Sequence, residues 1–362
     1  MSTVENITDM DAEAQKAARK EKIFSRINTI SNYLNIVGLG WITPILKIIA
    51  GDNPKYQMKE LWQGLMVPLI AIAVFIGGWA YLAPQVKTSL GAIPGPMQVI
   101  EQTGALWQDH LSEREKASAF YERQDKRNAK YITEGKPERV RHRTYTGKPT
   151  YIDQIFTSLQ TVFMGFIIGT IIAVPIGIAC GLSPVVNSAF NPIIQIFKPV
   201  SPLAWLPIVT MIVSAVYVTS DPWFSKAFIT SALTVMLCSI WPTIINTALG
   251  VASIDKDLMN VSKVLQLDWR TKVFKLVLPS SLPLIFTGLR LSLGVGWMVL
   301  IAAEMLAQNP GLGKFVWDEF QNGSSSSLAK IMVAVFTIGI IGFILDRAMM
   351  ALQTMFTHTA NR

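Results

Sequence analysis

The stretch that decides the fold runs from Leu278 to Leu306 and reads LPSSLPLIFTGLRLSLGVGWMVLIAAEML. It is long and apolar enough to cross a bilayer, because a hydrocarbon core of about 30 Å needs about 20 apolar residues in a helix. Two Leu-Pro pairs open the stretch, Arg290 lies inside it and Glu304 lies near its end. The stretch therefore predicts a membrane-spanning helix that carries charges.

The rest of the chain repeats this composition. Hydrophobic residues make up 51% of its 362 residues and charged residues 15%, whereas soluble domains average about 25% charged residues. Backbone groups in lipid must be hydrogen-bonded internally, so long apolar runs are read as helices. We predict an all-α membrane protein with six spans: Gly64–Ala83, Ser158–Leu182, Ala189–Val218 (broken), Ala227–Gly250, Leu282–Leu306 and Leu328–Met350.

This count predicts the organisation of the whole chain. Residues 1–63 form a cytoplasmic segment with an amphipathic helix, 64–84 the first transmembrane helix, and 85–157 an external segment with a charged helical insert. Residues 158–350 form a five-helix core with a cytoplasmic loop at 251–281, and 351–362 form a cytoplasmic tail. Both termini are placed in the cytoplasm because the N-terminal segment and the 251–281 loop are rich in Lys and Arg. The basic 85–157 segment lies opposite, but it is too long for the charge rule to apply.

Composition also bounds the partners. The net charge of +8 comes from basic residues between the spans, so it predicts no nucleic-acid partner. Cys180 and Cys238 both lie in apolar runs and are expected to be buried thiols rather than a disulfide. The first 22 residues are polar, which predicts no secretory signal.

Two polar segments leave alternatives open. In residues 21–50, apolar side chains recur at helical spacing with basic residues opposite: Ile23, Phe24, Ile27, Ile30, Tyr33 and Leu34. Such a helix lies along a membrane face or packs on a partner subunit. The insert around residues 107–131 also has a helical pattern, with Glu122 four residues before Lys126. It is either a solvated charged helix or a docking surface for an external partner.

The loop at 251–281 predicts two short amphipathic helices. Ile254, Leu258, Val261 and Leu265 share one helical face, and Ser253 can cap the first helix. The second helix begins after Asp268 and places Trp269, Val273 and Val277 on one stripe. Pro279 is expected to end it, since proline lacks an amide donor, and Pro283 then lies in the first turn of the next span. The prolines therefore predict a sharp corner into the membrane.

This loop resembles that of the permeases of bacterial ATP-binding-cassette importers. Their loop has Glu-Ala-Ala, a glycine four positions later and Ile-x-Leu-Pro after ten more. Here the same spacing is filled by Asn260, Val261, Ser262, Gln266, Leu276, Leu278 and Pro279, so the Glu, both Ala and the Gly of the pattern are replaced. Residues 264–306, GLGKFVWDEFQNG at 311–323, KPVSPLAWLPIV at 198–209, WPTIINTALGV at 241–251 and IPGPMQVIEQ at 93–102 resemble the nitrate-type permeases closely. The bicarbonate, taurine and alkanesulfonate permeases are somewhat less similar. Much of 111–148 and the N-terminal segment lie outside this pattern.

The resemblance implies a type I importer permease in a bacterial inner membrane. Such permeases pair with a second copy of themselves, with two cytoplasmic ATP-binding subunits and with an external substrate-binding protein. Their coupling loop sits in a cleft of the ATPase. The residues expected to make this contact here are Asn260, Val261, Ser262, Leu265, Gln266, Leu276, Leu278 and Pro279. The chain itself has no G-x-x-x-x-G-K-[ST] phosphate loop. We therefore expect it to bind no cofactor or metal, with ATP and magnesium on the partner.

Charged and polar residues inside the spans are candidates for the substrate pathway. An arginine near the centre of a span costs about 2.5–3.5 kcal/mol on insertion scales. Arg290 either snorkels to the cytoplasmic side, forms a structural pair, or lines an anion path. Lys198 precedes Pro199, Pro202 and Pro207, which are expected to break the third span.

The neighbours of the break, Ser201 and Trp205, belong to the same candidate pathway, although a kinked packing helix explains the prolines equally well. Asn246 either hydrogen-bonds between helices or lines the path. Glu304 is either structural or part of an outer gate. Gly165, Gly169, Gly177 and Gly181 are spaced for close helix contact.

Three function classes remain to be weighed. The leading hypothesis is a permease that imports a small anion, nitrate or nitrite, with bicarbonate, taurine and alkanesulfonates as alternatives. An enzyme is disfavoured because none of the three histidines, His110, His142 and His358, lies in a span. A passive anion channel is also disfavoured, because it would not need the capped helix pair predicted on the cytoplasmic side.

Overall fold

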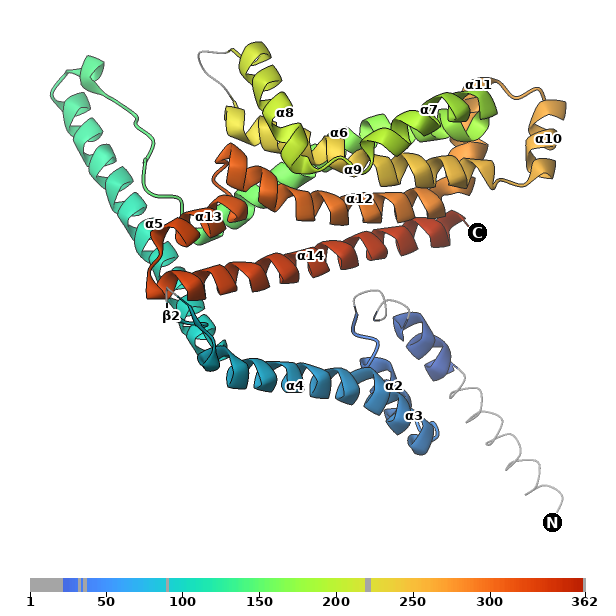
Figure 1. Ribbon diagram of the computed structural model, residues 1–362, viewed down its shortest axis with the longest axis horizontal. Helices are drawn as coiled ribbons and strands as arrows, with labels where there is room; N and C mark the ends of the chain where they lie inside the picture. Colours follow the sequence, from blue (N-terminus) through green and yellow to red (C-terminus); the bar gives the residue numbers. More distant parts are fainter. Residues whose placement is uncertain (1–21, 32–33, 35–37, 89–90, 219–222, 361–362) are drawn as a thin grey trace. The chain divides into compact units, whose positions relative to one another are not determined.

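The computed structural model describes residues 22–31, 34, 38–88, 91–218 and 223–360, and these residues are almost entirely helical (Figure 1). Contacts divide the chain into two units, residues 1–82 with 344–362 and residues 83–343. Five helices are long and apolar enough to span a membrane, or six if one bent pair counts as one span. The expectation of six spans therefore depends on that pair.

The first unit contains the N-terminal helices and the end of the last helix. Its elements are a helical stretch at 22–31, α2 (Ile42–Ile49), α3 (Pro54–Leu61), η1 (Trp62–Met66), α4 (Val67–Leu82) and the C-terminal part of α14 (Ser325–Ala360). Every side chain of α4 from Val67 to Ile76 is exposed and apolar, as expected for a lipid-facing helix.

The N-terminal amphipathic pattern is described only in part. Ile27 is buried, whereas Ile23 and Ile30 are each about half exposed. Tyr33 and residues 1–21 lie outside the described residues. Gly38 lies near the C-terminal part of α14. A side-chain carbon added to Gly38 would be 3.9 Å from the Arg347 side chain.

The second unit is built around three packed helices, α6 (Tyr151–Leu182), α9 (Lys226–Ala252) and α12 (Leu278–Ala307). Its other elements are η2 (Ala83–Gln85), β1 (Lys87–Thr88), β2 (Gly91–Ala92), α5 (Pro96–Thr133), η3 (Pro137–Arg139), α7 (Pro184–Phe197), α8 (Pro202–Val216), α10 (Lys256–Val264), α11 (Trp269–Lys272), η4 (Val273–Val277), α13 (Leu312–Asn322) and the start of α14. β1 and β2 form a two-stranded antiparallel ribbon.

Glycines allow α6 to approach α9 closely. A methyl group on Gly177 would lie 2.5 Å from Thr247, and one on Gly181 would lie 2.5 Å from Val251. Gly169 has ordinary clearance, since its added carbon would be 3.6 Å from Met236. The predicted packing role is therefore confirmed for Gly177 and Gly181, as it is for Gly165.

The predicted break in the third apolar run is confirmed. α7 ends at Phe197, α8 begins at Pro202, and their axes differ by 102°. Pro199 and Pro202 explain this, because each lacks a donor N–H and disfavours helix in the residue before it. Ser201 caps α8 by accepting a hydrogen bond from the Leu203 N–H at 3.3 Å.

The expected corner at Pro279 is wrong. α11, η4 and α12 form one helical run of 39 residues from Trp269 to Ala307. η4 is a π-helical turn, in which the Leu278 N–H bonds the Val273 carbonyl five residues earlier. This shift of the hydrogen-bond register immediately before Pro279 lets the helix continue where the proline lacks a donor. The Ser281 hydroxyl also donates to the Val277 carbonyl at 2.7 Å.

Candidate coupling surface and substrate pathway

α10 and α11 project from the end of the helical core where α9 ends and α12 begins (Figure 1). Asp255 caps α10 by accepting from the Asp257 N–H at 2.9 Å. The expected cap, Ser253, instead ends α9 and donates to the Gly250 carbonyl. Asp268 caps α11 as predicted, and its hydrogen bond from Thr271 lowers the pKa of its carboxyl.

Apolar side chains on this segment remain exposed. We define the coupling surface as six residues that are each at least 42% exposed: Leu258, Val261, Val264, Leu265, Trp269 and Phe274. Val273 and Val277, predicted to share a stripe with Trp269, are instead buried, and Ile254 packs against the cluster that contains Val277. Exposed apolar side chains at this density on short helices are typical of a surface that another protein covers.

The turn after α10 has the geometry that glycine usually supplies. Gln266 has φ of 47°, one of only two positive values among the described non-glycine residues. The N–H groups of Gln266 and Leu267 bond the Lys263 and Ser262 carbonyls, which closes the helix end. The importer loop has glycine at this position, so the left-handed turn fits the predicted frame. Ser262, at an alanine position of that frame, is 2% exposed.

Lys198 lies at the end of α7 and lines a cavity of about 370 Å³ between α6, α7 and α9. Asn187, Asn191 and Gln195 line the same cavity. Sequence reasoning missed these three amides, although their spacing with Lys198 along the helix places all four on one face. Among the described residues Lys198 has no ion pair or side-chain hydrogen bond, and no carboxylate lines the cavity.

Aromatic rings pack around the α7–α8 break. Phe197 lies between Trp205 and Trp241, with ring centroids 5.5 Å and 6.2 Å apart. The buried indole N–H groups of Trp205 and Trp241 find no acceptor within the described part of the chain. Buried donors usually have a hydrogen-bond partner, so these two indole N–H groups are donors that an acceptor near the break could use.

The remaining candidates lie on α9 and α12. Arg290 is half-buried on α12. Asn246 donates to the Pro242 carbonyl of its own helix at 2.8 Å and packs against Gly288 of α12. The arrangement therefore uses Asn246 in helix packing.

Glu304 is fully buried near the end of α12. Its carboxylate accepts hydrogen bonds from the Ser158 hydroxyl at 2.8 Å and from the Gly313 N–H at 3.0 Å. The Asn309 amide donates to it at 3.4 Å and to the Thr161 hydroxyl at 3.1 Å. The carboxylate thus joins α12, α6 and the N-terminus of α13, where the helix dipole favours negative charge.

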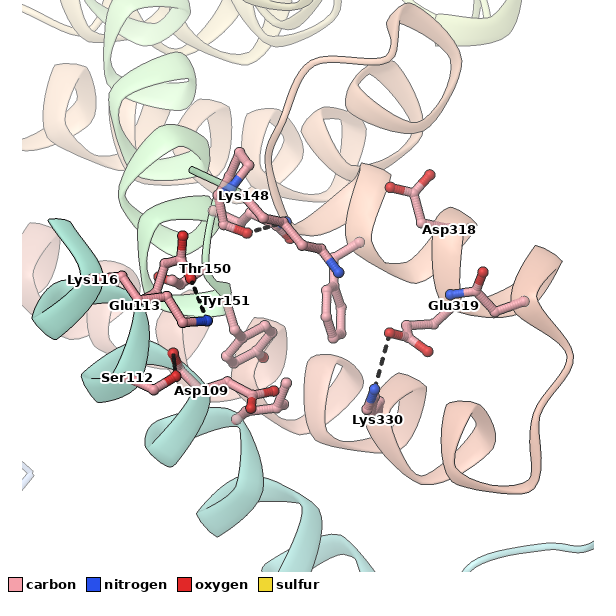
Figure 2. Close-up of a pocket in the computed structure, with 15 residues that line it drawn as sticks. Asp109, Ser112, Glu113, Lys116, Lys148, Thr150, Tyr151, Asp318, Glu319 and Lys330 are labelled. Carbon is pink, nitrogen blue, oxygen red and sulfur yellow. Dashed lines mark hydrogen bonds and ion pairs between the residues drawn. The ribbon is translucent and has the colours of Figure 1, made fainter. Parts of the chain in front are cut away.

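A second hollow lies where the charged insert meets the core. It has a volume of about 230 Å³ and is enclosed by α5, the start of α6, α13 and the start of α14 (Figure 2). Figure 2 shows Lys116 beside Glu113 and Lys330 beside Glu319; these pairs are 3.3 Å and 3.4 Å apart. Because it mixes both signs of charge, this hollow is less suited to an anion than the cavity beside Lys198.

Side-chain contacts join the base of the insert to the start of α6. His110 hydrogen-bonds Thr150 at 2.7 Å, and Arg114 forms an ion pair with Asp153. Further along α5, the Gln124 amide makes two hydrogen bonds with the backbone of Arg143, of 2.7 Å and 3.2 Å. α5 therefore packs against the segment that returns from it to α6, and is not a lone solvated helix.

Comparison with known proteins places this architecture in a family. Residues 173–358 match the family described as binding-protein-dependent transport system inner membrane component. The nitrate import permease protein NrtB of Synechocystis sp. is 32% identical over 310 residues, which cover 84% of this chain and 96% of the relative.

Two further relatives match over shorter stretches. NrtB of Synechococcus elongatus is 35% identical over 194 residues, 54% of this chain and 66% of the relative. The bicarbonate transport system permease protein CmpB of Synechocystis sp. is 36% identical over 203 residues, 56% of this chain and 68% of the relative. Relatives named for two different anions therefore match this chain about equally well in identity.

Proposed function

The chain belongs to the binding-protein-dependent transport system inner membrane components, the permease subunits of ABC importers, and on that premise we propose that it imports nitrate. As a multi-pass inner-membrane permease of the nitrate-type group it is not itself an enzyme, and it works with ATPase and substrate-binding partners. The observation that supports nitrate over bicarbonate is the match along nearly the whole length of a nitrate permease. Nitrite, bicarbonate, taurine and alkanesulfonates are the alternatives.

The driving force enters through the coupling surface. Its exposed apolar side chains fit a cleft in a cytoplasmic ATP-binding subunit, where their burial stabilises the contact by about 25 cal/mol per Å². ATP and magnesium bind to that subunit, and this chain supplies no catalytic group. Lys256, Lys263, Arg270 and Lys272 on the same segment support a cytoplasmic location.

The helical run from Trp269 to Ala307 transmits the movement. At 1.5 Å per residue its 39 residues extend for about 58 Å, enough to cross the bilayer. At one end it carries Trp269 and Phe274 of the coupling surface, and at the other Glu304 holds α13. A displacement of the ATPase therefore reaches the outer end along one unbroken element, without a flexible joint at Pro279.

A second copy of the chain completes the pathway. The anion crosses between the two permeases, past the α7–α8 break with Lys198, Ser201 and Trp205, and past Arg290 on α12. Positive charge lowers the barrier for an anion in a low-dielectric path. An external binding protein delivers the anion, and both termini lie in the cytoplasm.

The test is uptake by membrane vesicles that contain this chain with its ATPase and binding protein. Nitrate, bicarbonate and taurine are supplied separately, with ATP or with a non-hydrolysable analogue. We expect nitrate to accumulate against its gradient only with ATP. Accumulation of bicarbonate or taurine alone would replace the proposed substrate, and equilibration of anions without ATP would indicate a passive channel.

A further inference from the structure

The polar face of α7 is out of place in a membrane span. Asn187, Asn191, Gln195 and Lys198 recur at intervals of four, four and three residues and are all exposed. The opposite face carries Val185 and Ile196, which are 79% and 64% exposed. One face of this helix is therefore suited to lipid and another is not, because amide groups facing hydrocarbon would lose their hydrogen bonds to water.

The cavity beside this face has the chemistry of an anion site. Its lining combines one cation with three side-chain amides and otherwise has small or apolar side chains from α6 and α9. One internal hydrogen bond, from Gln195 to Asn191 at 3.0 Å, orients two of the amides. The Asn191 and Asn187 N–H groups and the Lys198 ammonium remain as donors.

The structure next to the cavity is also rich in donors. The helix is broken immediately after Lys198, and the indole N–H groups of Trp205 and Trp241 beside Phe197 lack acceptors in the described conformation. Irregular backbone and unpaired donors at membrane depth are tolerated where they line a water-filled cavity or meet a ligand. These donors suit an oxyanion, because its oxygen atoms accept hydrogen bonds. In the described part of the chain, no carboxylate lines the cavity to repel it.

We propose that Asn187, Asn191, Gln195 and Lys198 form a binding site for a small oxyanion on the cytoplasmic half of the pathway. The anion accepts hydrogen bonds from the amides while Lys198 balances its charge. The inference rests on the proposed import function and adds a site that the candidate residues of the sequence did not include, apart from Lys198. Pro199 follows Lys198 directly and prevents the helix from continuing, so the site lies at the C-terminal end of α7.

Cysteine accessibility tests the site without requiring transport. In a chain carrying Cys180→Ala and Cys238→Ala, assembled with its ATPase in inverted vesicles, Asn191→Cys is treated with a charged, membrane-impermeant thiol reagent. Ile193→Cys on the same helix is the matched control. We expect the reagent to modify position 191 and not 193. Equal modification of both positions would overturn the site, because α7 would then be solvated all round.

Protection by anions identifies what the site holds. Choline salts of nitrate, bicarbonate and gluconate, and taurine itself, are added before the reagent. At ten times its Kd, nitrate should slow modification of Asn191→Cys about tenfold by occupancy, and gluconate should not. Protection by bicarbonate or taurine but not nitrate supports the site and contradicts nitrate as substrate. Protection by none of these anions overturns the site.

A charge-matched pair of variants completes the test. Lys198→Gln should lower nitrate uptake about tenfold or more, the loss expected for one charge-assisted hydrogen bond. Lys226→Gln, at the far end of α9 and exposed, should leave uptake unchanged. Equal effects of the two substitutions would contradict a specific role for Lys198.

Discussion

Replacing Glu304 tests how the C-terminal end of α12 is held. In Glu304→Ala the Ser158 hydroxyl and the Gly313 N–H lose their buried acceptor, and the Asn309 amide keeps only the Thr161 hydroxyl. Each unsatisfied buried group costs about 1–3 kcal/mol, so we expect the free energy of unfolding to fall by roughly 4 kcal/mol. The vacated volume adds to this cost, since the packed surroundings relax only partly.

Glu304→Gln should cost far less, about 1–2 kcal/mol. The amide oxygen of the new side chain can still accept a hydrogen bond from the Gly313 N–H. Its NH₂ group would face the Asn309 amide, but Asn309 can turn over, because its oxygen has no donor among the described residues. Glu304→Ala is therefore expected to cost far more stability than Glu304→Gln. The difference comes from the hydrogen bonds that each variant can still make, since both variants remove the charge.

The assay is equilibrium unfolding of the purified chain in mixed detergent and SDS micelles, followed by tryptophan fluorescence. Asp318→Ala is the control, because this carboxylate on α13 makes only a partly exposed pair with Lys314 at 2.6 Å. Such pairs contribute at most about 1 kcal/mol. The reasoning is refuted if Glu304→Ala unfolds within 1 kcal/mol of the unmodified chain, or if Asp318→Ala costs as much.

Three further predictions follow from other parts of the chain. Val261→Asp should leave the fold intact, because the side chain is 52% exposed, and should uncouple ATP hydrolysis from transport; unchanged substrate-stimulated ATPase activity would contradict the coupling surface. Gln266→Gly should stabilise the chain by up to about 1 kcal/mol, since φ is 47°, and a measured loss of stability would count against this turn. Gln124→Ala with Asn128→Ala should speed proteolysis of the segment returning from α5, whose backbone both amides hold, whereas Lys126→Ala should not; equal cleavage rates would sink this reading.

Several features were predictable because they depend on local sequence. Pro199 and Pro202 locate the helix break, since the geometry of proline acts on its own neighbours. The left-handed backbone at Gln266 was not predicted, because glutamine gives no local signal for it; only the spacing of the coupling loop places this residue where the importer loop has glycine. Asp268 was recognised as a cap from its place before an amphipathic run.

Other features depend on contacts that a linear pattern does not contain. The partners of Glu304 include Ser158, which is 146 residues away in the chain. Continuity of the helix through Pro279 depends on a π-helical turn. No residue type predicts such a shift of the hydrogen-bond register. Asp255 replaced Ser253 as the cap of α10, because two competing acceptors two residues apart are decided by where α9 ends.

The most direct test of the account is whether an ATPase subunit grips the coupling surface. Val264 is 82% exposed, so Val264→Cys can carry a short thiol-reactive crosslinker in the assembled transporter. The account predicts a crosslink to the ATPase subunit that weakens or strengthens when ATP is added, and none from Lys226→Cys. Labelling of position 264 by an impermeant reagent from outside intact cells, with no crosslink to the ATPase, would contradict it.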